Sequence, residues 1–157
     1  MKQTRKLLKQ SPTFFRRLPT LEQRHHIQKN RPLSYHAHYK AQDTLRLYEA
    51  AGALLYREQM FRIPNLTAAQ IAETLGCNPR ALSAAMSHSP HKNFRTLLAA
   101  TRVEEACRQL RNPELADLRI EDIAINCGFL SRQAFYLAFQ NIMGMTPRQY
   151  RLEQYAL

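Results

Sequence analysis

One sequence pattern occurs twice in this chain, as IAETLGCNPRALSAAM at residues 71–86 and as IAINCGFLSRQAFYLAF at residues 123–139. In each copy an Ile-Ala pair is followed by a glycine five residues after the isoleucine, and then by a helix-capping residue. Apolar residues follow at four and eight residues beyond the cap, which places them on one face of a helix. Each copy therefore predicts a helix, a short turn and a second helix, which together have the size of a helix-turn-helix unit.

Capping residues mark where these helices are expected to begin. Thr67 and Gln70 have the spacing of a capping box, in which each side chain satisfies the other residue's backbone amide. Asn78 precedes a proline, which is tolerated at a first helical position because its missing N–H would have no partner there. Ser131 takes the same place in the second copy, whereas Arg119 stands where a cap equivalent to Thr67 would be. The first helix of the second copy is therefore expected to lack a side-chain cap.

One long helix is predicted between the two copies. Asn93 can cap its start, apolar residues recur at helical spacing from 94 to 110, and Asn112-Pro113 ends it. With seventeen residues, this helix would span roughly 25 Å. A helix is also predicted over about 43–59 and another from Thr146-Pro147 toward the end. The apolar positions that support the helix at 43–59 are Leu45, Leu47, Tyr48, Ala51, Leu54, Leu55 and Met60.

The composition is that of a folded, mostly helical protein. Apolar residues make up 45% of the 157 residues, and only four residues are glycine, which argues against a turn-rich β-sandwich. No apolar run reaches the ~18 residues of a membrane span, and no signal peptide follows the N-terminal charges. The three cysteines are odd in number and far apart, so we expect small buried thiols in a reducing cytoplasm. The expected fold class is all-α and the expected location is cytoplasmic.

The positive charge is concentrated at the N-terminus. The chain has a formal net charge of +11, of which residues 1–40 contribute +9 with ten Lys or Arg and one acid. Such an arm attracts polyanions through counterion release. A solvated tail or linker, an auxiliary phosphate contact and a membrane-surface role all stay open for it. Short helices are expected within the arm at Thr4–Gln10 and Leu21–Lys29.

Neither a metal site nor an enzyme active site is expected. The histidine pairs His25-His26, His36/His38 and His88/His91 lack the neighbouring cysteines or acids that a four-ligand zinc site requires. The sequence has no glycine-rich phosphate loop, no paired carboxylates in an apolar setting and no cysteine beside a histidine. Glu104-Glu105 and Glu121-Asp122 are interpreted as solvated helix faces. No cofactor is therefore predicted.

Residues 66–151 resemble the DNA-binding domain of the AraC/XylS family of bacterial transcription regulators. The residues that carry the resemblance are Leu66-Thr67, Ile71-Ala72, Gly76, Arg102-Val103, Ala106, Leu110, Ile123-Ala124, Gly128-Phe129, Ser131, Phe135, Phe139, Gly144-Met145-Thr146-Pro147 and Tyr150-Arg151. The resemblance implies two helix-turn-helix units joined by one linker helix, with two recognition helices in adjacent major grooves. It implies a sequence-specific transcription regulator that binds double-stranded promoter DNA, with RNA polymerase and a sensor domain as further candidate partners.

The resemblance also assigns candidate DNA-contacting residues by position. The first recognition helix would present Arg80, Ser83 and Ala84, and the second would present Arg132, Gln133, Tyr136 and Leu137. Arginine can bind guanine through O6 and N7, glutamine can bind adenine through N6 and N7, and tyrosine can contact a thymine methyl group or a phosphate. Ala84 and Leu137 stand where the family often has a long polar side chain. The alternative function is therefore a protein-interaction module of the same fold with weak or non-specific DNA binding.

Three other positions carry structural expectations. His91 stands where glycine commonly makes the turn before the linker helix, so a left-handed backbone is expected there. Gln109 replaces an apolar residue near the end of the linker helix. Arg102 is expected to form a structural ion pair with Glu105 or Glu121.

The expected organisation is a basic arm or linker at 1–41 and an AraC-type DNA-binding domain at 42–157. Within the domain, the first helix-turn-helix unit is expected at 43–92, the linker helix at 93–111 and the second unit at 119–157. The chain is expected to be a stand-alone regulator or the output half of a larger sensor, because about 41 residues are too few for a sensing domain.

Overall fold

The computed structural model describes residues 41–155 of the chain, and every regular element in that range is a helix. The elements in order are α4 (Ala41–Arg57), the 3-10 helix η1 (Met60–Arg62), α5 (Ala68–Thr74), α6 (Pro79–Ser87), α7 (Phe94–Arg111), the 3-10 helix η2 (Pro113–Leu115), α8 (Ile120–Asn126), α9 (Arg132–Met143) and α10 (Pro147–Tyr155). The predicted all-α class is confirmed. The helices expected at Thr4–Gln10 and Leu21–Lys29 lie outside the described residues. Within residues 41–155, no helix has both the length and the apolar character to cross a membrane.

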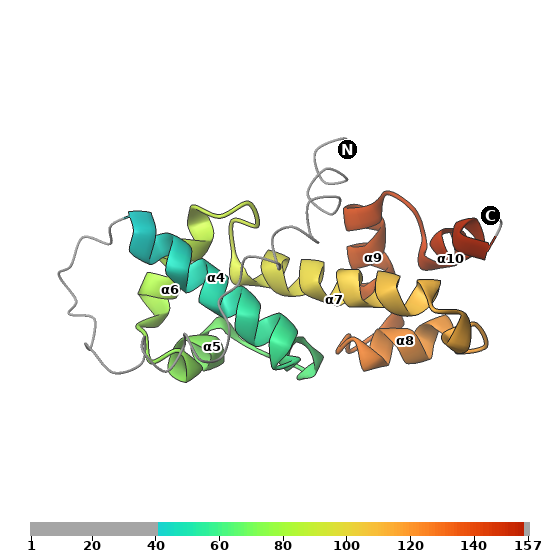
Figure 1. Ribbon diagram of the computed structural model, residues 1–157, viewed down its shortest axis with the longest axis horizontal. Helices are drawn as coiled ribbons and strands as arrows, with labels where there is room; N and C mark the ends of the chain where they lie inside the picture. Colours follow the sequence, from blue (N-terminus) through green and yellow to red (C-terminus); the bar gives the residue numbers. More distant parts are fainter. Residues whose placement is uncertain (1–40, 156–157) are drawn as a thin grey trace.

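The helices form two units at the two ends of α7 (Figure 1). The first unit packs α4, α5, α6 and η1 together, and the second packs α8, α9 and α10. Both units contact α7, which therefore belongs to both and joins them. The predicted order of two helix-turn-helix units with one linker helix is the order that the structure has.

The predicted caps are present at the helix starts. Thr67 and Gln70 form the complete capping box at α5. Asn78 accepts a hydrogen bond from the Arg80 amide at 2.8 Å, and Ser131 accepts one at 3.1 Å from the amide three residues further on. Each cap satisfies a backbone donor that the first turn of a helix leaves without an intrahelical partner. These local bonds explain why α5, α6 and α9 begin where the sequence predicts.

The start of α8 is stabilised differently. Arg119 stands at the cap position and provides no side-chain cap, as predicted. Its guanidinium instead donates two hydrogen bonds to the carboxylate of Asp122, each at 2.9 Å. The hydrogen bonds from Arg119 hold the pKa of Asp122 below its usual range. An ionised carboxylate in a first turn also interacts favourably with the helix dipole.

The turn inside each unit requires a left-handed backbone. Gly76 has a φ of 64° and Gly128 has a φ of 82°, a region that glycine enters at little cost. The sequence also predicts this conformation at His91, and that prediction is wrong, because Lys92 has the positive φ, 65°. The turn closes one residue later than expected, since the amide of Lys92 donates to the carbonyl of Ser89 at 3.2 Å.

Each unit has its own hydrophobic core. The core of the first unit contains Tyr48, Ala51, Leu55, Phe61, Leu66, Ile71, Ala72, Leu82, Met86, Leu97 and Leu98. The core of the second contains Val103, Ala106, Cys107, Leu110, Ile123, Ala124, Cys127, Phe129, Phe135, Phe139 and Tyr150. The repeated apolar positions are therefore buried in both copies. The expectation that Leu45 belongs to the apolar face of α4 is wrong, because its side chain is 54% exposed.

The three cysteines are free thiols. Cys107 and Cys127 are buried, and burial raises the pKa of each to about 12. Cys77 is half-buried. Protonated thiols in such surroundings pack like small apolar side chains. The predicted burial is therefore confirmed for Cys107 and Cys127, whereas Cys77 is only partly buried.

The two units touch directly where η1 meets the turn of the second unit. A Cβ placed at Gly128 would lie 2.5 Å from the carbonyl oxygen of Phe61. Arg102 on α7 donates from Nε to the same carbonyl at 2.8 Å and from Nη2 to the carbonyl of Ile63 at 2.9 Å. Its guanidinium carbon also lies 5.6 Å from the centre of the Phe129 ring. These five residues are called the junction below.

The sequence predicts that Arg102 pairs with Glu105 or Glu121, and the structure contradicts this prediction. Arg102 binds backbone carbonyls instead, because Glu105 is already paired with Arg62 and Arg108. Burial lowers the pKa of Arg102. The guanidinium remains protonated, because an arginine cannot be deprotonated under these conditions.

Glu105 is also not on a solvated helix face as expected, because its side chain is only 6% exposed. Arg108 donates to both carboxylate oxygens, at 2.7 Å and 2.6 Å. Gln109 is buried and donates to the same carboxylate at 2.8 Å, which explains a polar residue at a position where an apolar one is expected. Arg62 of η1 completes the cluster at 3.3 Å. A buried charge is tolerated here because it is paired and hydrogen-bonded.

We expect Gly128→Ala to destabilise the fold by about 2–5 kcal/mol, because a side chain there meets both a positive φ and a backbone oxygen. Gly76→Ala is the matched control, since Gly76 also has a positive φ but a Cβ added there would meet no described atom within 4 Å. The control should lose only about 1–2 kcal/mol, the cost of the left-handed backbone. Urea unfolding of both variants measures the difference, and equal losses would show that Gly128 is not in a tight contact.

Glu105 also predicts a pH dependence of stability. Burial by itself raises the pKa of this carboxyl, but hydrogen bonds from Arg108 and Gln109 and the charges of Arg108 and Arg62 lower it by more, so its pKa lies below 4.5. A group with a depressed folded-state pKa stabilises the protein above its unfolded pKa and loses this contribution as the pH falls through its folded pKa.

We therefore expect Glu105→Gln to lower the free energy of unfolding by about 1–3 kcal/mol near pH 7. The difference from the wild type should shrink as the pH falls below about 4.5, because the carboxyl then takes up a proton in the unfolded state and, at lower pH, in the folded state. Denaturant titrations at several pH values provide the measurement. The exposed Glu114→Gln is the control, and a difference that stayed constant down to pH 3 would contradict the assignment.

Candidate nucleic-acid interface

Helix α6 presents the first group of candidate residues on its exposed face. Its cap at Asn78 and its first proline fix where the helix begins, and thus which side chains face outward. The buried side chains are Ala81, Leu82, Ala85 and Met86. Arg80, Ser83 and Ala84 are all exposed, as a recognition surface requires. The single face of α6 that remains available to a ligand is therefore the one that these three residues share.

Helix α9 presents the second group in the same way. Phe135 and Phe139 are fully buried and anchor the helix on α7 and α8. Arg132, Gln133 and Leu137 are exposed, and Tyr136 is half-buried. Tyr136 lies edge-on to the Phe135 ring with centroids 5.8 Å apart, so its ring is held by the core of the second unit.

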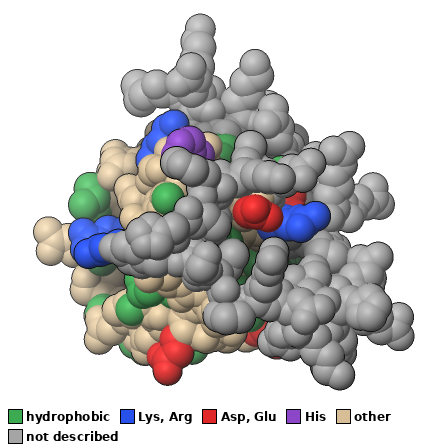
Figure 2. Space-filling view, turned by 90° about the vertical axis from the view of Figure 1, so that its left-hand side faces the viewer, with side chains coloured by type: hydrophobic (Ala, Val, Ile, Leu, Met, Phe, Trp, Pro, Cys, Tyr) green, Lys and Arg blue, Asp and Glu red, His purple; other side chains and the backbone are tan. Residues whose placement is uncertain are grey.

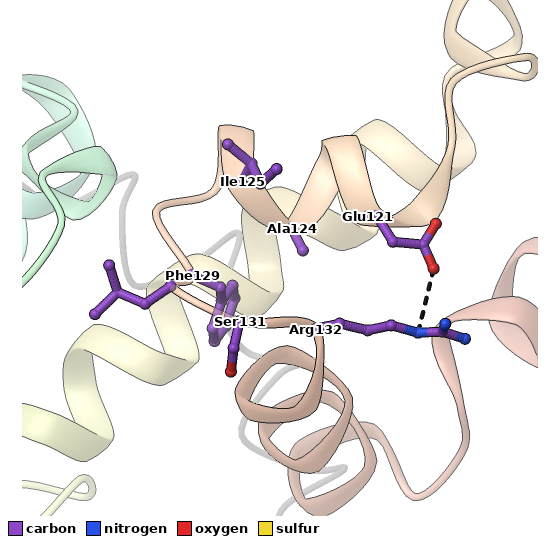
Figure 3. Close-up of a pocket in the computed structure, with 7 residues that line it drawn as sticks. Glu121, Ala124, Ile125, Phe129, Ser131 and Arg132 are labelled. Carbon is purple, nitrogen blue, oxygen red and sulfur yellow. Dashed lines mark ion pairs between the residues drawn. The ribbon is translucent and has the colours of Figure 1, made fainter.

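Arg132 makes two contacts that bear on the direction of its side chain. Its Nε lies 3.2 Å from Oε1 of Glu121 on α8, and its guanidinium carbon lies 5.1 Å from the centre of the Tyr136 ring. Figure 3 shows the arginine extended from the start of α9 toward the carboxylate in the first turn of α8, away from the turn that joins the two helices. Both charged side chains are substantially exposed, at 67% and 41%. The pair therefore holds the arginine in place only weakly, since exposed ion pairs are worth about 0–1 kcal/mol.

A shallow pocket of about 230 Å³ lies beside this pair. Its lining residues are Glu121, Ala124, Ile125, Phe129, Leu130, Ser131 and Arg132. Ile125 and Leu130 are strongly exposed, at 69% and 65%. The pocket thus has an apolar wall beside an ion pair, directly at the start of α9 (Figure 3).

Charge on the opposite end of the molecule is mixed. Figure 2 looks onto the end that carries α4 and α6, and its visible described surface intersperses basic, acidic and apolar side chains. The described atoms visible in this view thus show individual basic side chains and no continuous basic patch.

The candidate residues fall into two groups that the tertiary structure keeps apart. The group on α6 lies at one end of α7, and the group on α9 lies on the unit at the other end (Figure 1). Within each group the exposed side chains share one helix face. The arrangement provides two separate surfaces with donors for phosphate oxygens and base edges, and each is built on a capped helix.

The sequence pattern does not predict Glu121 as a partner of this surface. The pattern places it on a solvated helix face, but it pairs with Arg132 of α9 from the first turn of α8. The two residues belong to different helices, so no helical spacing relates them. The only local signal is an acidic residue in the first turn of α8, where the helix dipole favours it in any case.

The histidines form no metal cluster within residues 41–155, where no group of three or more His, Cys, Asp or Glu side chains could hold an ion. His88 lies with its Nδ1 2.8 Å from the carbonyl of Ala84. Burial lowers the pKa of His91, whose ring centroid is 6.2 Å from that of Tyr48. The pairs His25-His26 and His36/His38 lie outside the described residues.

Comparison with known proteins places this geometry among helix-turn-helix regulators. The family model described as "Helix-turn-helix domain" matches residues 71–153. A Staphylococcus aureus protein named "Uncharacterized HTH-type transcriptional regulator" is 33% identical over 87 residues, which are 55% of this chain and 11% of that protein. The chain thus spans about a tenth of the length of this curated relative.

Solved structures show the same fold. The C-terminal domain of AraT, a response regulator from Geobacillus stearothermophilus, is 31% identical with a TM-score of 0.57, over 68% of this chain and 84% of that chain. A DNA-binding transcriptional dual regulator from Escherichia coli K-12 is 22% identical with a TM-score of 0.61, over 71% of this chain and 94% of that chain. At 22% identity, the likeness to the Escherichia coli protein concerns the fold alone.

Proposed function

Because the chain belongs to the AraC-type helix-turn-helix family of DNA-binding regulators, we propose that it binds specific promoter sequences with α6 in one major groove and α9 in the next. The observation that carries this proposal is the pair of exposed, capped helix faces at the two ends of one continuous helix. The family is one of transcription regulators and not of enzymes, and the proposed activity is binding.

The length of α7 supports the use of successive grooves. With 18 residues, the helix is roughly 27 Å long. Two recognition helices on one face of B-DNA need centres about 34–36 Å apart. The helix together with the width of the packed units is of that order. One polypeptide would then do what two subunits of a dimeric repressor do.

The proposed mechanism divides the contacts by chemistry. Helix N-termini and Lys or Arg side chains contact phosphates and fix the register of the protein on the duplex. Arg80 and Arg132 are the candidates for guanine, and Gln133 for adenine. The remaining candidate contacts are made by Ser83 and Ala84 on α6 and by Tyr136 and Leu137 on α9.

The partners follow from this proposal. Double-stranded promoter DNA is the principal one, and the basic residues 1–40 add phosphate contacts. We extend the proposal to RNA polymerase and to a sensor domain, since the similar structures include the C-terminal domain of a response regulator. The division into an arm at 1–41 and a DNA-binding domain at 42–157 is part of the same proposal, as is a cytoplasmic location beside the DNA.

A second candidate function rests on the two least polar candidates. Ala84 is exposed on α6, and Leu137 is 61% exposed on α9. Apolar side chains at the centre of an exposed helix face also suit a protein partner. This alternative is an interaction module of the same fold that binds DNA weakly or without sequence preference.

Selection from a random duplex pool separates the two functions. The full chain is incubated with the pool at fixed salt, and bound sequences are enriched over several rounds. The proposed function expects a bipartite motif whose halves are about one helical turn apart. If no sequence were enriched, and the affinity for DNA varied with salt concentration but not with sequence, the result would support the interaction module instead.

We expect Arg132→Ala to lose about 1–3 kcal/mol of affinity for the selected site, because a bidentate arginine–guanine contact is removed. Affinity for a random duplex should fall much less. Gel shifts on both duplexes at one salt concentration measure the two losses. The exposed Arg111→Ala on α7 is the charge-matched control, and equal losses on both duplexes would assign Arg132 to a phosphate contact.

We expect Glu121→Gln to raise the affinity for the selected site by ~2–5-fold, because it releases Arg132 from an exposed ion pair worth under about 1 kcal/mol. Glu114→Gln, which makes the same charge change on η2, should have a smaller effect. The double variant with Arg132→Ala tests the route, since the gain should vanish when Arg132 is absent. A gain that persisted in the double variant would mean that Glu121 acts on DNA directly.

A further inference from the structure

We propose that Arg102 is a positioning residue that fixes the orientation of one helix-turn-helix unit relative to the other. In doing so it would set the half-site spacing that the protein accepts on DNA. The proposal rests on the proposed function for its DNA consequence. Its structural part, the fixed orientation, stands on the junction alone.

Arg102 is placed to join three segments at once. It is part of α7, it donates to two carbonyls of the segment that follows α4, and it stacks over a ring of the second unit. The two hydrogen bonds, at 2.8 Å and 2.9 Å, come from a rigid, planar guanidinium, so they define a direction as well as a distance. Because this one side chain binds the carbonyls of Phe61 and Ile63 and also stacks on the Phe129 ring, it restricts rotation of one unit relative to the other.

The backbones of the two units also meet at this point. Besides the carbonyl of Phe61, a Cβ at Gly128 would lie only 3.0 Å from the Cα and from the carbonyl oxygen of Arg62. The glycine therefore sits against η1 without any side chain between them. A rotation of the second unit toward η1 would drive backbone into backbone, and a rotation away from η1 would break the stacking on Arg102.

A second set of contacts reinforces the first further along α7. Arg62 of η1 reaches Glu105 on α7 at 3.3 Å. Gln109, which holds the same carboxylate, also lies 3.8 Å from the sulfur of Cys127 in the second unit. These contacts therefore link η1, α7 and the second unit a second time, through residues other than those of the junction.

Arg151 provides an internal comparison. It lies on α10, the helix that follows α9, and donates to the carbonyls of Ala116 and Leu118 ahead of α8, at 3.3 Å and 2.8 Å. Arg102 lies on α7, the helix that follows α6, and holds the segment ahead of α5 in the same manner. Each arginine closes its own unit, but Arg102 also stacks on a ring of the other unit. Arg151→Ala is therefore a control that removes a similar clamp inside one unit.

The consequence on DNA follows from the geometry of the duplex. Each base pair inserted between two half-sites moves the second by about 3.4 Å and rotates it by about 34°. A protein with a fixed orientation between its units binds tightly to duplexes of only one half-site spacing. A protein whose units rotate freely binds duplexes of several half-site spacings with similar affinity.

The experiment uses the full chain as wild type, Arg102→Ala, Arg102→Lys and Arg151→Ala. The probes are the duplex selected from the random pool, duplexes with one or two base pairs inserted between its half-sites, and duplexes with a single half-site. For the wild type we expect one inserted base pair to reduce affinity about 10-fold or more, the scale of losing a base contact.

Arg102→Ala should reduce this spacing penalty to under about 3-fold, with single half-site affinity close to that of the wild type. Arg102→Lys should fall between the two, because lysine keeps the charge but cannot hold two carbonyls in one plane. Arg151→Ala should keep the full penalty. A full penalty in Arg102→Ala would overturn the proposal.

A measurement without DNA keeps the proposal testable in every case. Spin labels at Ser87→Cys on α6 and Gln140→Cys on α9, in a chain with Cys77→Ser, report the distance between the two units by pulsed electron resonance. Both labelled positions are exposed, whereas Cys107 and Cys127 are buried. Arg102→Ala should broaden the distance distribution and Arg151→Ala should not. If the distance distributions of the wild type and of Arg102→Ala had equal widths, the proposal would be overturned, even if the wild type had selected no DNA sequence.

Loss of folding is controlled separately. Circular dichroism and thermal unfolding show whether Arg102→Ala retains its helices, and Phe129→Leu serves as the second variant. Phe129→Leu keeps an apolar side chain in the core but removes the ring beneath the guanidinium. Phe129→Leu should broaden the distance distribution, as Arg102→Ala does. An unchanged distribution in a folded Phe129→Leu variant would contradict the proposal. If the wild type enriches no motif but the distances behave as expected, the proposed function fails and the positioning role stands.

Discussion

The close approach of the η1 backbone to Gly128 is the constraint on which the two-unit arrangement depends. A carbonyl oxygen of the first unit fills the space that any Cβ at this position would need, and Arg102 binds the same oxygen from α7. The glycine also has the positive φ that the turn before α9 requires. One residue therefore serves the turn of the second unit and its contact with the first. A linker helix alone fixes a distance, whereas this contact also fixes a rotation.

Carboxylates on α7 and α8 make structural contacts at positions where the sequence pattern predicts a solvated helix face. Glu105 is buried because arginines from η1 and from the next turn of α7, with a glutamine, satisfy its carboxylate. Glu121, by contrast, stays partly exposed and pairs with Arg132 at the start of α9. The first carboxylate contributes to stability through desolvated, hydrogen-bonded contacts. The second is too exposed for that and instead affects an arginine on the proposed DNA-binding face.

The candidate surface divides into a part that local rules determine and a part that they do not. Caps and buried anchors decide that Arg80, Ser83 and Ala84 face outward on α6, because a helix with a known start and a known buried face has only one exposed face. The partners of those side chains come from other elements. The pairing of Arg132 with Glu121 and its stacking on Tyr136 depend on how α8 packs on α9, and periodicity carries no information about that.

The sequence by itself determined the all-α class, the repeated unit, the caps, the turn glycines and the apolar faces of the repeated helices, because each depends on residues close together in the chain. It misplaced the left-handed residue before α7, the partners of Arg102 and the burial of Glu105. Each of these errors concerns contacts that the local pattern does not encode. Arg102 binds residues about 40 positions earlier, and a cation can be satisfied equally well by a carboxylate or by carbonyls. Only the tertiary structure decides which acceptor is within reach, and with it how the two units face each other.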